Sequence, residues 1–137
     1  MTKTILDFQV IDNKQLNQDI FILELASDKS LPEILPGQFV QVRIDGSPGT
    51  FLRRPFSVHD MNREHNTIKL LIQIAGEGTR TLSFKKRGDI LNLILPLGNS
   101  FSLPAENEKV LLVGGGCGVA PLLFFVSFWS SADSSLP

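Results

Sequence analysis

The first hundred residues alternate between short apolar runs and turn-forming residues, a pattern typical of a β-rich fold. In Phe39–Ile44, for example, every second residue from Val40 onward is aliphatic, as in a strand with one buried face. Gly, Pro, Asn and Asp separate the runs. Six runs are predicted to be strands: Ile5–Val10, Ile20–Leu25, Phe39–Ile44, Arg54–His59, Thr67–Ile74 and Asp89–Leu95. They predict an all-β fold, a six-stranded antiparallel Greek-key barrel, with one short helix at Thr79–Lys86.

The pattern changes after Pro104. A polar linker, Ala105–Lys109, leads into the apolar run Val110–Val113 and then into a cluster of glycines. An apolar run of this kind predicts a buried parallel strand that feeds a helix, which is how a nucleotide-binding α/β domain begins. We therefore predict a barrel domain at 1–104, and a linker with the truncated start of a nucleotide-binding α/β domain at 105–137. The stretch Phe128–Pro137 is expected to be a frayed end.

The stretch from Val110 to Ala132 contains no charged residue, and its length would allow a membrane span. Four glycines and Pro121 fall in its first half, however, and both residue types have low helix propensity. We therefore prefer a strand, a glycine turn and the start of a helix.

Composition narrows the classes of function. The net charge of −1 gives no basic excess for binding a nucleic acid backbone. Cys117 is the only cysteine, so the chain forms no internal disulfide and no four-cysteine cluster. No signal peptide is evident at the N-terminus, and a cytoplasmic location is expected. No catalytic residue and no metal ligand is predicted.

The first motif that suggests a binding function is Arg54-Pro55-Phe56-Ser57. Arginine suits a diphosphate because its planar fork matches two phosphate oxygens. Because side chains alternate along a strand, Arg54 and Phe56 should point one way, and Pro55 and Ser57 the other. The alternative is an edge strand that carries two solvated arginines.

The second motif is Gly76-Glu77-Gly78-Thr79. Small residues let backbone N–H groups approach an anion closely, and a helix that begins here would add its positive end. The alternative is a plain loop with Thr79 as the helix cap. One strand, Thr67–Ile74, separates this motif from the first, so both can lie at the same end of a barrel.

The third motif, Gly114–Pro121, follows the predicted strand and precedes an apolar segment, which is the setting of a dinucleotide-binding loop. Its spacing departs from G-x-G-x-x-G. The alternative is a glycine turn without a ligand.

Taken in order, the three motifs resemble the ferredoxin–NADP⁺ reductase superfamily, and within it the family of electron-transfer subunits of type B dihydroorotate dehydrogenases. The resemblance covers residues 1 to about 124. It implies FAD on the barrel and NAD on the domain that follows. The implied FAD-binding residues are Arg54, Pro55, Phe56, Ser57, Leu71, Ile72, Gln73, Gly78 and Thr79. The implied nicotinamide-binding residues are Gly114, Gly115, Gly116 and Gly118.

The resemblance also implies a function, namely electron transfer between NAD and a catalytic dihydroorotate dehydrogenase subunit, which oxidises dihydroorotate to orotate in pyrimidine biosynthesis. In that family a [2Fe-2S] cluster is held by four cysteines, which this chain lacks. Two alternatives stay open: a truncated flavin-binding module without turnover, and a non-enzymatic barrel with an apolar interaction tail. The apolar C-terminal segment could also join copies of the chain into an oligomer.

Overall fold

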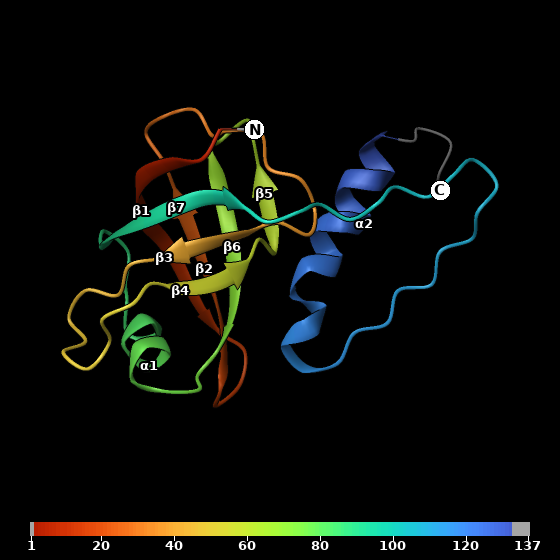
Figure 1. Ribbon diagram of the computed structural model, residues 1–137. Helices are drawn as coiled ribbons and strands as arrows, with labels where there is room; N and C mark the ends of the chain where they lie inside the picture. The colour runs from red at the N-terminus through yellow and green to blue at the C-terminus, as the bar shows by residue number, and fades with distance from the viewer. Residues whose placement is uncertain (1, 133–137) are drawn as a thin grey trace.

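The computed structural model describes residues 2–132 and shows a curled β-sheet with a helix at its side (Figure 1). The strands are β1 (Thr4–Gln15), β2 (Ile20–Ala26), β3 (Phe39–Val42), β4 (Arg54–Ser57), β5 (Asp60–Asn62), β6 (Thr67–Gln73) and β7 (Ile90–Leu97). The helices are α1 (Glu77–Ser83), a short 3₁₀ helix (Gly116–Val119) and α2 (Ala120–Ala132).

All strand pairs are antiparallel, and the order across the sheet is β4-β3-β7-β1-β2-β6-β5. This order confirms the predicted antiparallel Greek-key arrangement. The two edge strands, β4 and β5, are consecutive in the chain. Between them, the Val58 N–H donates to the Gln38 carbonyl at 3.1 Å and the His59 N–H to the Lys69 carbonyl at 2.9 Å. The segment from β4 to β5 therefore joins the two edges of the curled sheet.

The sheet has seven strands where the sequence predicted six. The predicted strand Arg54–His59 ends at Ser57, and the chain then changes partner and pairs with β6 as β5. A segment that closes a curled sheet has to leave one neighbour for the other, which interrupts its hydrogen-bonding ladder.

The interior of the barrel is apolar and follows the predicted alternation. In β3, Val40 and Val42 are buried, whereas Phe39 and Gln41 are partly exposed. Leu82 of α1 is fully buried in the same core, so the short helix covers one end of the barrel. The predicted helix is confirmed, although it begins earlier, at Glu77, and ends at Ser83. Its end is capped by Asn13, whose Nδ2 donates to the Ser83 carbonyl at 2.9 Å.

The predicted strand Val110–Val113 is wrong. The segment is extended but has no strand partner, and Leu111 is 86% exposed. A parallel strand needs neighbours on its edges and cover on its faces, and residues 2–132 supply no parallel strand to pair with it.

The predicted fraying from Phe128 onward is also wrong within the described residues, because α2 continues to Ala132. The helix is held by Phe124 and Phe125, both nearly buried, and the Phe125 ring meets Phe101 edge-on at 5.6 Å. Residues 133–137 of the predicted frayed end lie outside the described residues. No helix within residues 2–132 has the length and apolar character needed to cross a membrane.

Candidate functional site

Strand β4 forms a ledge at the edge of the sheet. Its pairing sets Arg54 opposite Val42 and Phe56 opposite Val40, so Arg54 and Phe56 share one face, as predicted. Phe56 is partly buried and packs against the core, so only part of its ring can meet a ligand. The Arg54 Nη1 donates to the Leu52 carbonyl at 3.2 Å. A guanidinium has five N–H donors, so most of this fork remains available to a ligand.

The two neighbouring arginines, Arg53 and Arg54, differ in their hydrogen bonds. Arg53 turns back over the sheet, and its Nη1 donates to the Asn92 carbonyl at 3.0 Å and more weakly to the Gln41 carbonyl at 3.4 Å. Its Nη2 donates to Asn92 Oδ1 at 2.6 Å. The alternative of two solvated arginines therefore does not describe Arg53, and the sequence motif alone did not reveal this difference.

The turn before α1 is ordered by one hydroxyl. Thr79 Oγ1 accepts the N–H groups of Ala75 at 2.8 Å and Gly76 at 3.1 Å, and it donates to the Gly76 carbonyl at 3.2 Å. A hydroxyl offers one donor and two acceptor positions. All three are used here, so the Thr79 side chain organises the turn rather than reaching toward a ligand.

The same turn packs against the loop that leads into β4. The Gly49 N–H donates to Glu77 Oε1 at 3.2 Å. A Cβ at the buried Gly78 would lie 3.2 Å from Thr50 Cγ2, so a larger residue would push the loop and the helix apart. Figure 1 shows α1 directly below β4, which places the first two motifs at the same end of the barrel.

The three residues predicted at the end of β6 differ in how far their side chains are exposed to a ligand. Ile72 is 1% exposed and belongs to the core, so only its backbone can face a ligand. Leu71 and Gln73 lie on the opposite, outer face of the strand and are more exposed. The Cys117 thiol donates to Gln73 Oε1 at 3.4 Å, which joins the glycine cluster to the end of β6.

The glycine cluster forms a compact turn ahead of α2. Gly116 has a φ of +57°, and a Cβ at Gly114 would lie 2.8 Å from Val119 Cγ1, so both positions need glycine. Gly115 and Gly118 face open space. His59 donates from Nδ1 to the Ala120 carbonyl at 2.6 Å. The turn is thereby held against the barrel beside the other two motifs.

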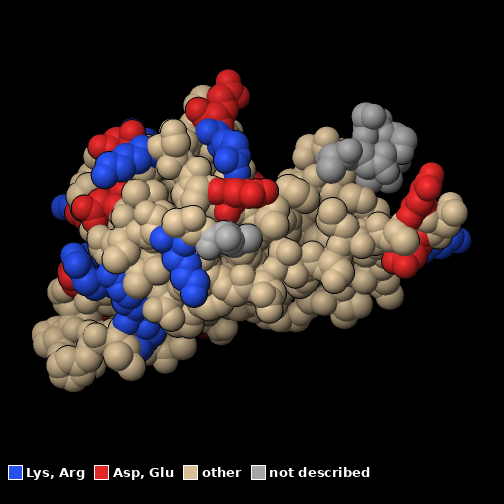
Figure 2. Space-filling model, turned by 45° about the horizontal axis from the view of Figure 1, so that its top comes forward, with Lys and Arg blue, Asp and Glu red and all other residues tan. Residues whose placement is uncertain are grey.

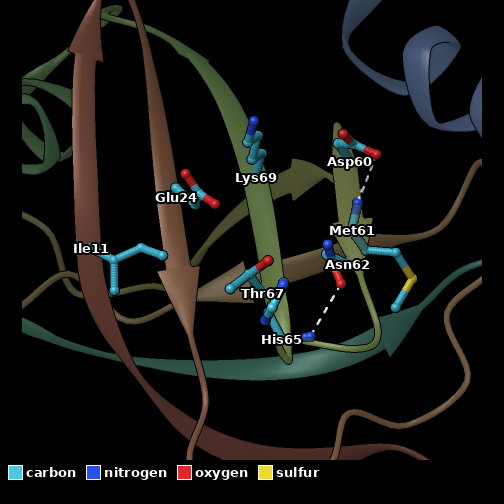
Figure 3. Close-up of a pocket in the computed structure, with 8 residues that line it drawn as sticks. All are labelled: Ile11, Glu24, Asp60, Met61, Asn62, His65, Thr67 and Lys69. Carbon is cyan, nitrogen blue, oxygen red and sulfur yellow. Dashed lines mark hydrogen bonds between the residues drawn. The ribbon is translucent and has the colours of Figure 1, made fainter.

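A separate hollow of about 360 Å³ lies on the outer surface of β2, β5 and β6. Figure 3 shows Glu24, Lys69 and Asp60 on adjacent strands at its wall. The hollow extends to Thr67, where β6 begins, whereas the three motifs gather where β6 ends. None of the predicted cofactor-binding residues lines this hollow, so it is not the candidate site. Residues 2–132 contain no cluster of side chains suited to hold a metal ion.

Charged side chains are distributed unevenly over the face shown in Figure 2. They gather over the barrel, whereas the surface beside it is almost free of them apart from a small group at the far end of the molecule. The candidate site lies between β4, the start of α1 and the turn that precedes α2.

Comparison with known proteins gives a consistent picture. Residues 7–110 match the family model of the oxidoreductase FAD-binding domain. The chain is 42% identical, over 116 residues, to the "dihydroorotate dehydrogenase B (NAD(+)), electron transfer subunit" of Caldanaerobacter subterraneus subsp. tengcongensis, covering 85% of this chain and 44% of that protein. It is 36% identical, over 122 residues, to the protein of the same name from Desulforamulus reducens, covering 89% and 47%. The chain thus spans less than half the length of these relatives.

Solved structures agree on the fold. The ferredoxin reductase of carbazole 1,9a-dioxygenase superposes with a TM-score of 0.83 at 24% identity, over 100% of this chain and 41% of that one. An NADH-dependent reduced ferredoxin–NADP oxidoreductase, described in the context of flavin-based electron bifurcation, superposes with a TM-score of 0.73 at 33% identity, over 84% and 41%.

Proposed function

Because this chain belongs to the oxidoreductase FAD-binding domain family, we propose that its barrel holds FAD within an electron-transfer subunit. That subunit would pass electrons between NAD and a catalytic dihydroorotate dehydrogenase subunit. The observation that carries this proposal is the meeting of three motifs at one end of the barrel, where the Arg54 fork is largely unused. The two relatives, which are electron transfer subunits of dihydroorotate dehydrogenase B, support the partner and the substrate in this proposal.

The residues at this end of the barrel fit a dinucleotide. The Arg54 guanidinium matches the paired oxygens of a diphosphate. In this proposal the backbone N–H groups of Gly78 and Thr79 meet the same group, and the open space beside Gly76 leaves room for it at the start of α1. The accessible part of Phe56, together with Pro55, Ser57, Leu71 and Gln73, offers a mixed apolar and polar wall for a flavin ring.

The residues of this chain bind and orient rather than react. FAD, when bound, would supply the chemistry that connects hydride transfer with single-electron transfer. Hydride transfer requires no acid or base from the protein. In the same proposal, residues 1–104 form the FAD domain and residues 105–137 begin the NAD domain, with Gly114, Gly115, Gly116 and Gly118 toward the nicotinamide nucleotide.

FAD retention tests the proposal directly. We expect the purified chain, mixed with FAD and then desalted, to remain yellow and to show the visible absorption of bound flavin. The FAD-binding family match and the free Arg54 fork are the reasons for this expectation. A colourless protein after desalting would refute FAD binding.

A second candidate, a flavin-binding module without turnover, is favoured by the unpaired segment Val110–Val113. If NADH fails to reduce flavin that the chain has retained, whereas dithionite reduces it, this second candidate describes the chain as it stands.

The apolar C-terminal segment is also proposed to join copies of the chain. Leu111 and Val113 are 86% and 82% exposed, and no charge lies between Val110 and Ala132. We expect the double substitution Leu111→Asp and Val113→Asp to shift the chain from oligomer to monomer in size-exclusion chromatography with light scattering, because a buried carboxylate is costly. The control is Ile5→Asp, at an exposed apolar position on β1. A wild-type chain that is monomeric at all concentrations would contradict the proposal.

A further inference from the structure

A row of polar side chains crosses the outer face of the sheet and ends at the candidate site. Asp7 of β1 lies opposite Asn92 of β7, and Asn92 Nδ2 donates to Asp7 Oδ1 at 2.7 Å. On its other side, Asn92 accepts the Arg53 guanidinium through both its side chain and its carbonyl, at 2.6 and 3.0 Å. Asp7, Asn92 and Arg53 form what we call the Arg53 clamp.

The Arg53 clamp acts on a stretch of chain that has little other support. The residues just before it, Phe51 and Leu52, are 91% and 75% exposed. Arg53 is therefore the first well-anchored side chain between the loop and β4. Because successive side chains of an extended chain point to opposite sides, anchoring Arg53 over the outer face of the sheet directs Arg54 to the opposite face, which it shares with Val42 and Phe56.

We propose that Arg53 is a positioning residue, which does not touch the diphosphate but fixes the direction of the Arg54 guanidinium through the Arg53 clamp. This inference rests on the proposed binding of FAD at Arg54. It assigns different tasks to two adjacent residues of the same type: Arg54 contacts the ligand, and Arg53 lowers the cost of holding that contact, since a side chain already held in place loses less conformational freedom on binding.

The test is the FAD dissociation constant, measured by quenching of flavin fluorescence in purified variants. We expect Asn92→Ala to weaken FAD binding by about tenfold, the effect of losing one hydrogen bond to a charged group. Arg53→Lys should weaken binding similarly, because an ammonium lacks the planar fork that bridges the side chain and carbonyl of Asn92.

A rescue variant separates positioning from general structural damage. In Asp7→Asn combined with Asn92→Asp, the donor and acceptor between β1 and β7 are exchanged, and the new carboxylate at position 92 still accepts the Arg53 guanidinium. We expect FAD affinity to stay within about threefold of the wild type in this variant, since every hydrogen bond of the clamp is retained. Thermal unfolding of the ligand-free proteins shows whether any variant is merely unstable.

A double-mutant cycle provides the decisive readout. If the Arg53 clamp acts through Arg54, then Asn92→Ala should change FAD affinity by less than about twofold once Arg54→Ala is present, because coupled sites are not additive. Full additivity would overturn the inference, and so would an unchanged affinity in both Asn92→Ala and Arg53→Lys. Failure of the wild-type chain to bind FAD would instead refute the proposed function.

Discussion

Replacement of Arg54 with alanine is expected to weaken FAD binding by about 10- to 150-fold, which corresponds to the roughly 1.5–3 kcal/mol of hydrogen bonds to a charged group. Among residues 2–132, the guanidinium makes one hydrogen bond, to the Leu52 carbonyl, and this bond lies at the surface. Its removal should therefore leave the thermal stability of the ligand-free protein nearly unchanged. Titration of FAD against both proteins measures the first effect, and thermal unfolding without FAD measures the second.

Arg63→Ala is the matched control for Arg54→Ala. Arg63 is exposed in the turn between β5 and β6, at the opposite end of β6 from α1. It carries the same charge, so it reports any effect of net charge alone on the affinity for an anionic ligand. Equal losses in the two variants would indicate general electrostatic attraction and would argue against a diphosphate contact at Arg54.

The barrel could be predicted from the sequence because its signals are local. Each strand carries its own alternation, and the turns between strands carry Gly, Pro, Asn or Asp. The division of the predicted strand Arg54–His59 into β4 and β5 could not be predicted in this way. It depends on the chain leaving β3 for β6, and these two strands are the second strands from opposite edges of the sheet.

The unpaired segment Val110–Val113 failed as a strand for a related reason. An apolar run favours a buried strand, but the hydrogen bonds of a strand belong to its partners. The sequence pattern describes the side chains of the run and says nothing of whether a partner is present.

The candidate site was predicted as three motifs, and the structure shows what joins them. Alternation along β4 predicts that Arg53 and Arg54 point in opposite directions, but it does not tell which of them is free. That depends on Asn92, which lies far along the chain on β7. One signal was available: Asn92 is the single polar residue in the otherwise apolar strand ILNLILPL. A polar residue in such a strand indicates hydrogen-bonding partners, and Asp7 and Arg53 are those partners.

Replacement of Thr79 with valine is expected to weaken FAD binding by about 10- to 30-fold, because it removes the acceptor of two backbone N–H groups, each hydrogen bond contributing roughly 1 kcal/mol. Valine keeps the shape and the β-branch of threonine, so packing should change little. The ligand-free protein should lose protection of the Ala75 and Gly76 amides against hydrogen exchange, since both donate to the Thr79 hydroxyl. Thr81→Val, in the same helix, is the control, and it should leave both measurements unchanged.

Hydrogen exchange distinguishes the two roles that the Thr79 hydroxyl could have. If the hydroxyl contacted the phosphate directly, Thr79→Val would weaken FAD binding and leave the exchange of Ala75 and Gly76 in the ligand-free protein as it was. The structure favours the other outcome, because the single proton and both acceptor positions of the hydroxyl are already engaged by Ala75 and Gly76. The turn is then built before the ligand arrives. In the proposed complex with FAD, the backbone N–H groups of Gly78 and Thr79, rather than the hydroxyl, would meet the diphosphate.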